Sequence, residues 1–130
     1  KLENSIVFKG RMPYEEMMQY THHAKLGITI DKDTNTNYKY SLPNKLFDFI
    51  HAGIPILASK IIEVEKIIKK YQIGLFINNH EPTHIANQIK YALNNKELML
   101  EWKSNTTIAT KELNWKIEEN TLKDLYKKIE

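Results

Sequence analysis

The sequence predicts an α/β fold, namely a three-layer, doubly wound parallel sheet of about four strands followed by C-terminal helices. Four short runs are apolar or β-branched almost throughout, which is typical of strands buried on both faces. These runs are Ser5–Phe8, Leu26–Ile30, Pro55–Ala58 and Gly74–Ile77. Helical spacing of apolar residues fills the gaps between them, and connections longer than a dozen residues favour parallel pairing.

Helices are predicted from apolar residues that recur three and four positions apart. Between the strands they fall at Tyr14–Thr21, Leu46–Ile50 and Ile61–Tyr71, and after the last strand at Glu81–Leu93, Lys96–Leu113 and Trp115–Ile129. Proline is tolerated in the first turn at Pro82, Gly53 is expected to supply a left-handed cap, and Asn114 is the predicted N-cap of the final helix. The polar stretch Asp31–Leu42 is predicted to be a functional or mobile loop.

Length and composition indicate one globular domain, with 130 residues, 42% hydrophobic and 27% charged. Cysteine is absent, which excludes disulfides, thiolate metal sites and a thiol nucleophile. The sequence has no apolar run long enough to span a bilayer, and its first residues do not show a charged-then-apolar signal pattern. Because the chain begins at Lys1 without a methionine, we interpret residues 1–130 as one partial domain of a longer protein.

The charge pattern argues against a nucleic-acid partner. The net charge is +3, and Arg11 is the only arginine, whereas nucleic-acid readers favour arginine for bidentate contacts. Most lysines lie beside glutamates, as on solvated helix faces. Peripheral contact with an anionic membrane surface through Lys66, Lys69 and Lys70 is the alternative for that cluster.

Ligands of open parallel sheets bind outside the carboxyl ends of the strands. Three segments follow successive predicted strands, Lys9–Pro13, Asp31–Asn44 and Ser59–Glu63. The middle segment opens a helix at Asn44 and Lys45, where free N–H groups and the helix dipole favour a phosphate.

Asp48 lies one turn further along the same helix, where its carboxylate can accept hydrogen bonds from a ribose diol. The plainer alternatives are an ordinary helix start signalled by Ser41 and Pro43, and a solvated Asp48.

The histidines do not predict a metal site. His22 and His23 are adjacent, so on a helix their side chains diverge by about 100°. His80 and His84 have a suitable spacing but no third ligand. Another histidine, His51, is placed to interact with its helix dipole.

The segment from Tyr40 to Pro55, YSLPNKLFDFIHAGIP, resembles the nucleotide-binding segment of family 4 glycosyltransferases, which have the Rossmann-like GT-B fold. The family pattern is a glutamate, seven residues, a second glutamate, and a helix that ends in Gly-x-Pro. Flanking residues also resemble the family's C-terminal domain, so the likeness covers nearly the whole chain. They include Gly10, Gly27, Ser59, Glu63, Gly74, Pro82 and Trp115.

The resemblance implies roles for matched positions. Asp48 takes the place of the glutamate that binds the ribose hydroxyls, and Tyr40 replaces the glutamate near the donor sugar. Asn44 and Lys45 are the implied donors to the diphosphate. The full set implied to bind the donor is Gly10, Arg11, Met12, Tyr40, Ser41, Leu42, Asn44, Lys45, Asp48 and Glu63, with the base near the first three.

The implied activity is transfer of a sugar from a nucleotide-diphospho-sugar, UDP- or GDP-linked, without a cofactor or a metal. The acceptor site and any catalytic histidine belong to an N-terminal domain that this chain lacks, so no catalytic residue is assigned here. We therefore expect the fragment alone to be inactive and its last helix to need a docking surface. Lysine-, asparagine- and isoleucine-rich usage suggests a bacterial surface-polysaccharide enzyme, cytoplasmic or peripheral to the membrane.

Two other functions stay open at this point. A GT-B nucleotide-sugar 2-epimerase shares this domain and its ligand. A doubly wound regulatory module without ligand chemistry is the third hypothesis, but a receiver needs an acidic cluster. Lys9 follows the first predicted strand instead, and Asp31 and Asp33 lack acidic companions.

Overall fold

Three parallel strands form the sheet at the centre of the fold. The computed structural model describes residues 2–129, and its strands are β1 (Gly27–Thr29), β2 (Ile56–Ser59) and β3 (Gly74–Ile77), in the order β1-β2-β3. Both pairings are parallel, with Ile56 opposite Gly27 on one side and Gly74 on the other. The prediction of an α/β fold with a parallel sheet is confirmed.

The predicted strand at Ser5–Phe8 is wrong. This segment forms no strand, and Val7 and Phe8 are 71% and 93% exposed. The Ser5 N–H donates to the Leu2 carbonyl in a turn at 2.8 Å. An apolar run favours a strand only where a neighbouring strand can pair with it. The sheet of the described chain therefore has three strands instead of about four.

Seven helices are described, and six of them match the predicted helices to within two residues at nearly every end. They are α1 (Tyr14–His22), α2 (Thr36–Lys39), α3 (Asn44–Ala52), α4 (Ile62–Tyr71), α5 (Pro82–Asn94), α6 (Lys96–Glu112) and α7 (Trp115–Lys127). The short α2 was not predicted and lies inside the expected loop, where the Asn35 side chain caps it by accepting from the Tyr38 N–H. Gly53 takes the predicted left-handed cap with φ of 72°.

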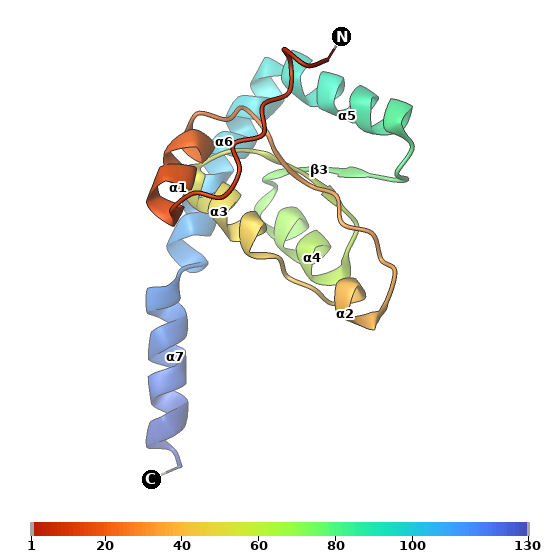
Figure 1. Cartoon of the computed structure of the whole chain (residues 1–130). Coiled ribbons are helices and arrows are strands. Elements are labelled where there is room, and N and C mark those ends of the chain that lie inside the picture. Colours follow the sequence, from red (N-terminus) through yellow and green to blue (C-terminus); the bar gives the residue numbers. More distant parts are fainter. Residues whose placement is uncertain (1, 130) are drawn as a thin grey trace.

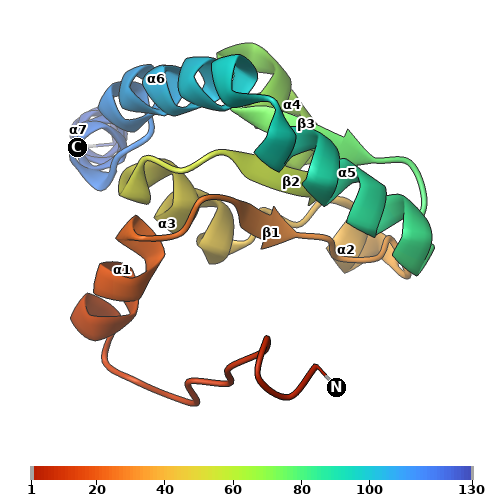
Figure 2. The ribbon, with the colours of Figure 1, turned by 90° about the horizontal axis from the view of Figure 1, so that it is seen from above.

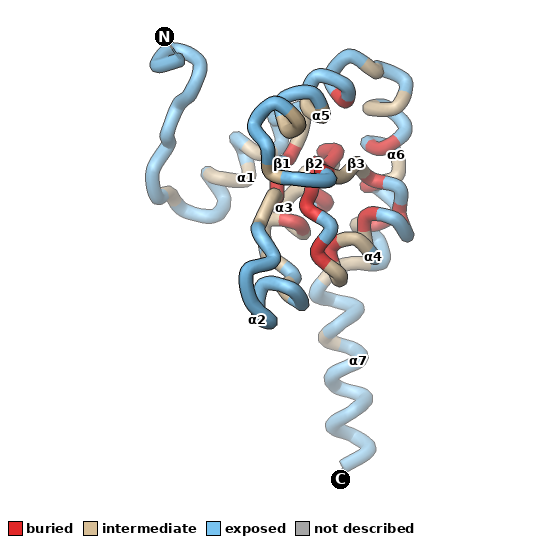
Figure 3. Tube along the Cα trace, turned by 90° about the vertical axis from the view of Figure 1, so that its right-hand side faces the viewer, coloured by how far each residue is buried: buried red, intermediate tan, exposed pale blue. Residues whose placement is uncertain are grey.

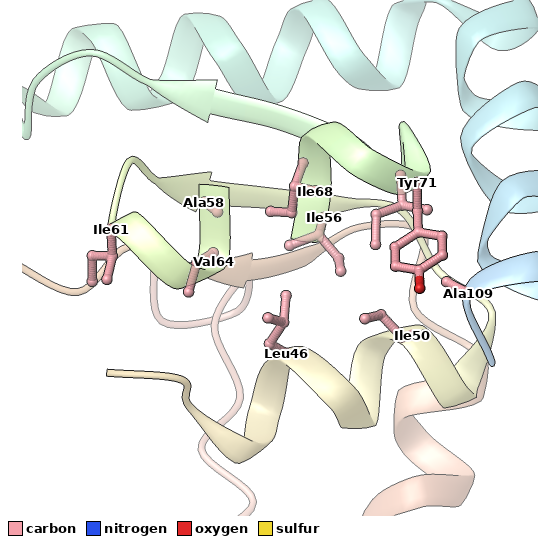
Figure 4. Packing of buried hydrophobic residues seen from close by; sticks show 10 residues of the cluster. Leu46, Ile50, Ile56, Ala58, Ile61, Val64, Ile68, Tyr71 and Ala109 are labelled. Atoms are coloured by element: carbon pink, nitrogen blue, oxygen red, sulfur yellow. The ribbon is translucent and has the colours of Figure 1, made fainter. Parts of the chain in front are cut away.

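Helices lie on both sides of the sheet. In Figures 1 and 2, α4 lies on one side of β3 and α5 on the other. The main core is the layer between the sheet and the helices α3 and α4 (Figure 4). It contains Leu46 and Ile50 from α3, Ile56 from β2, and Val64 and Ile68 from α4, each at most 1% exposed. All of β2 is buried because it is the central strand.

The last helix, α7, projects from the body of the fold (Figure 1). None of its residues is buried, and Figure 3 shows it exposed along its length. The predicted cap is confirmed, because the Asn114 side chain accepts from the Ile117 N–H at 3.2 Å. The expected apolar stripe, which includes Leu122 and Leu125 at 45% and 53% exposure, faces solvent.

The lysine cluster on α4 is paired. Nζ of Lys66 and Nζ of Lys69 lie 2.6 Å from glutamates one turn earlier on the helix, and Lys70 lies 3.1 Å from Glu112 on α6. These contacts fit the interpretation of a solvated helix face. None of the helices formed by residues 2–129 has both the length and the hydropathy that crossing a membrane requires.

Candidate functional site

The carboxyl ends of the three strands line a small hollow of about 170 Å³. We call it the strand-end hollow. Its lining comes from the last residues of β2 and β3 and from residues that follow each strand. The lining residues are Asp31, Asp33, Ser59, Lys60, Ile61, Ile77, Asn78, Asn79 and His80. Ligand pockets usually measure about 300–1,000 Å³, so this hollow can hold one small group of a ligand, not a whole nucleotide sugar.

Asp31 joins the end of β1 to the start of α3. Its carboxylate accepts from the Thr29 hydroxyl at 3.2 Å, and Nζ of Lys45 lies 3.1 Å and 3.0 Å from its two oxygens. The side chains of Lys45 and Asp31 are 43% and 31% exposed. A pair this accessible to solvent is weak and can be exchanged for another partner. Lys45 is therefore a cation held at the sheet edge and available to an incoming anion.

His80 connects all three strand ends. It follows β3, its Nε2 lies 3.1 Å from the Ile30 carbonyl after β1, and the Ser59 hydroxyl at the end of β2 is 3.4 Å away. A carbonyl only accepts, so Nε2 carries a proton and donates to Ile30. A second contact at this edge joins Lys60 Nζ to the Asn78 side-chain oxygen at 2.9 Å.

The start of α3 leaves backbone donors free. Its N-cap, Pro43, provides no side-chain cap, and within residues 2–129 the N–H groups of Asn44 and Lys45 have no hydrogen-bond acceptor. Ser41 is not the cap, because its hydroxyl donates to the Tyr38 carbonyl at 2.9 Å. Two free N–H groups at the positive end of a helix dipole, beside Lys45, form an arrangement that favours a phosphate.

Asp48 has a partner that the sequence did not indicate. The Tyr14 hydroxyl, at the start of α1, donates to its carboxylate at 2.9 Å. This bond, reinforced by partial desolvation and by the carboxylate's charge, raises the pKa of Tyr14 above its ordinary value. The two residues are 34 positions apart, so only the packing of α1 against α3 brings them together.

Other predicted donor-binding residues lie outside the strand-end hollow. Gly10, Arg11 and Met12 line a separate hollow of about 390 Å³ beside Tyr20, and the two hollows share no lining residue. Glu63 lies in the first turn of α4 and pairs with Lys66 at 2.6 Å.

Between α2 and α3, the segment 40–42 is largely solvent-accessible. Tyr40 is 56% exposed and Leu42 is 40% exposed, whereas Ser41 is half-buried.

The segment after β3 was not among the predicted site segments. The rule that selected the segments after the other strands applies equally to Asn78–His80, which lines the strand-end hollow. His80 and His84 were considered only as metal ligands. Instead, His84 Nε2 accepts from the Asn78 N–H at 2.9 Å, while His80 binds the Ile30 carbonyl. No three metal-ligating side chains cluster anywhere in residues 2–129.

Comparison with known proteins identifies the family of the chain. Residues 1–114 match the family described as "Glucosyltransferase 3-like, C-terminal domain". Searches of curated proteins and of solved structures found no match. The family match extends from the N-terminal segment to Asn114 and includes the whole sheet, the start of α3 and the strand-end hollow. This chain belongs to the glucosyltransferase 3-like C-terminal domain family.

Proposed function

We propose that this chain is the donor-binding half of a glycosyltransferase that transfers a sugar from a nucleotide-diphospho-sugar to an acceptor. The observation that carries the proposal is the start of α3. Two free backbone N–H groups and Lys45 lie there, next to the carboxyl end of β1. The family match supports a transferase over an epimerase or a regulatory module. In the finer proposal, the enzyme is a family 4-like, doubly wound GT-B transferase.

The diphosphate of the donor would bind at Asn44 and Lys45. As the glycosidic bond breaks, negative charge develops on the departing diphosphate, and preorganised donors stabilise that charge without reorganising. Lys45 would exchange its contact with Asp31 for a phosphate oxygen. Neither a metal nor another cofactor is needed in this scheme, because the helix dipole and the lysine supply the positive potential.

The nucleoside would extend from this point along α3 towards α1. Asp48 lies one turn beyond Lys45, and in the proposal its carboxylate accepts from the ribose hydroxyls. The base, of a UDP- or GDP-sugar, would lie near Gly10, Arg11 and Met12. The Tyr14 hydroxyl donates to Asp48, so in this proposal the ribose competes with Tyr14 for the carboxylate.

The acceptor site belongs, in this proposal, to a second, N-terminal domain that faces the strand-end hollow. The small volume of the hollow supports this view, because one wall of a two-domain cleft encloses little space by itself. The exposed apolar side chains of α7 are a suitable contact for that domain. We place the whole enzyme in bacterial surface-polysaccharide synthesis, in the cytoplasm or at the membrane periphery.

The proposal is tested by ligand binding. Saturation-transfer NMR would compare UDP, GDP and their sugars on the 130-residue chain and on Lys45→Ala and Asp48→Ala. We expect each variant to bind about tenfold more weakly, which corresponds to about 1.4 kcal/mol. Lys90→Ala, an exposed lysine on α5, is the matched control and should bind as the parent chain does.

Unchanged binding in both site variants would reject the donor site. A transfer assay with labelled nucleotide sugars tests the division of labour between the two domains. The chain alone should show no turnover, and clear turnover would contradict a purely donor-binding role.

A further inference from the structure

A second hollow, of about 490 Å³, lies at the opposite edge of the sheet, where β1 and β2 begin. We call it the strand-start basin. It lies between the end of α1, the residues leading into β1 and β2, and the corner where α5 meets α6. Its volume falls within the range of about 300–1,000 Å³ that is usual for small-ligand pockets, and the proposed function makes no use of it.

The basin has an apolar floor. Ile54 is 3% exposed and the neighbouring Pro55 is buried. Met99, on α6, is half-buried, and the rim carries Leu93 and Leu100, which are 43% and 68% exposed. A concave apolar surface with accessible leucines on its rim is suited to a hydrocarbon group.

The polar groups around this floor are basic. The basic side chains that line the basin are His22, His23, Lys25, Lys96 and Lys103, and no carboxylate lines it. None of the three lysines forms an ion pair with any carboxylate of residues 2–129. Lys96, Met99, Leu100 and Lys103 share one stripe of α6, whereas Glu97 and Glu101 lie on the neighbouring stripe.

Helix-end electrostatics explain the two histidines but not the lysines. The Nδ1 atoms of His22 and His23 lie 3.2 Å and 2.7 Å from the carbonyls of Ala52 and Gln19. Because carbonyls accept, each Nδ1 is the donor, so the remaining Nε2 of either ring can donate to an anion only in the imidazolium form. A basic residue at a helix C-terminus, such as His22 on α1, is favoured by the dipole.

Lys96 lies at the opposite type of helix end from His22, where the dipole does not favour a basic residue. It is the first residue of α6, where the helix dipole disfavours a cation. The N–H groups of Lys96 and Glu97 have no acceptor within the described chain, since Asn95 caps only Leu98. A bound anion would therefore relieve an unfavourable charge and satisfy free donors at the same point.

We propose that the strand-start basin binds an anionic amphiphile, a phosphate or carboxylate group joined to a hydrocarbon chain. The anion lies between Lys96, Lys103 and the histidines, and the chain covers Ile54, Met99 and Leu100. Both parts are needed, because exposed lysines alone bind an anion weakly in water. The same chemistry occurs in membrane lipids and in soluble lipid-like metabolites.

Binding of octyl phosphate to the full chain tests the site, followed by methyl and imidazole NMR signals. We expect shifts at the Met99 and Leu100 methyls and at His22, and affinity about tenfold lower in the double variant Lys96→Glu/Lys103→Glu. The matched control, Lys116→Glu on α7 with Lys128→Glu at its C-cap, makes the same change of charge and should bind normally. Leu100→Ser should also weaken binding, which separates the apolar contact from the charge.

Three results would overturn the proposal. They are inorganic phosphate binding as tightly as octyl phosphate, unchanged affinity in the Lys96/Lys103 variant, and equal losses in the α7 control. Vesicles of phosphatidylglycerol, compared with phosphatidylcholine vesicles, identify the source of the ligand. Sedimentation with the anionic vesicles assigns the site to a membrane lipid, and its absence together with octyl phosphate binding assigns it to a soluble amphiphile.

Discussion

Removing the Tyr14 hydroxyl should have opposite effects on stability and on nucleotide affinity. This hydroxyl donates to Asp48 at 2.9 Å, the carboxylate that we propose for the ribose. The Tyr14→Phe variant keeps the aromatic ring and deletes only the hydroxyl and its hydrogen bond. The folded chain loses a contact, whereas an incoming ribose no longer has to displace one.

The size of both effects follows from how far the Tyr14 side chain is exposed to solvent. A hydrogen bond to a charged group contributes about 1.5–3 kcal/mol when sheltered from solvent. Tyr14 is 57% exposed, and solvent screening reduces the contribution to about 0.5–1 kcal/mol. The melting temperature should therefore fall by about 2–4 °C, and the affinity for UDP or GDP should rise by about two- to fivefold.

Calorimetric unfolding and titration with the nucleotide measure the two effects on the same protein. Tyr91→Phe on α5 is the matched control, because Tyr91 is 55% exposed and its hydroxyl makes no hydrogen bond within residues 2–129. A lower affinity in Tyr14→Phe would mean that Tyr14 contacts the ligand instead of competing with it. An unchanged affinity, with the expected loss of stability, would mean that the ribose does not compete with Tyr14 for Asp48.

Three further predictions concern ionisation and packing. Tyr14 has a raised pKa, so its hydrogen bond stabilises the fold below the ordinary tyrosine pKa of 10.0 and is lost as the pH rises through the raised value. In tyrosinate absorbance, the ionisation of Tyr14 should therefore occur at a lower pH in Asp48→Asn than in the parent chain. The pKa of Glu112 is lowered, mainly by the hydrogen bond from Tyr71 and to a lesser extent by Lys70. The ionised Glu112 therefore stabilises the fold above the ordinary pKa of 4.5, and this stabilisation is lost as the pH falls through the lowered pKa. Urea midpoints at about pH 6 and about pH 3 should therefore differ less in Glu112→Gln than in the parent chain, and an equal difference would contradict this. Gly74→Ala should lower the free energy of unfolding by more than about 2 kcal/mol, because the added Cβ would overlap the Ile56 carbonyl oxygen across the β2–β3 pairing. Gly10→Ala is the comparison, because its Cβ would meet no atom within 4 Å and the variant bears only the strain of a positive φ.

The interior of the fold could be predicted because the sequence patterns that mark its strands and helices are local. Ile56 and Leu57 belong to an apolar run too short for a helix, and such runs are reliable where both faces are covered. The helices α4 and α6 repeat their apolar residues every three or four positions. The same local signal failed at Ile6, Val7 and Phe8, because a strand also needs a partner strand, and the sequence of the run does not reveal one.

The candidate site was only partly predictable because its contacts are long-range. The helix start at Asn44 and Lys45 follows from Pro43 and the spacing of apolar residues, and the structure places it beside Asp31. The hydrogen bond between Tyr14 and Asp48 joins residues far apart in the sequence, and no local pattern marks it. The role of His80 depends on the order of the strands, since its ring meets the Ile30 carbonyl only because β1 and β3 flank β2.

In our two proposals the edges of the sheet attract anions largely through different groups, and this difference is a consequence of the parallel strands. Helices that follow strands begin at the carboxyl edge, so α3 directs the positive end of its dipole towards the strand-end hollow, with Lys45 as a supplement. At the opposite edge α1 and α3 end, and their carbonyls are negative. The chain places His22, Lys25 and Lys103 there, beside the start of α6, so side chains supply much of the positive potential of the basin. Salt screens helix dipoles and exposed lysines alike, but the basin depends on three lysines and the proposed diphosphate site on one. Added salt should therefore weaken octyl phosphate binding at the basin more than nucleotide binding at α3. The reverse order would mean that Lys45, and not the backbone of α3, provides most of the attraction for the diphosphate.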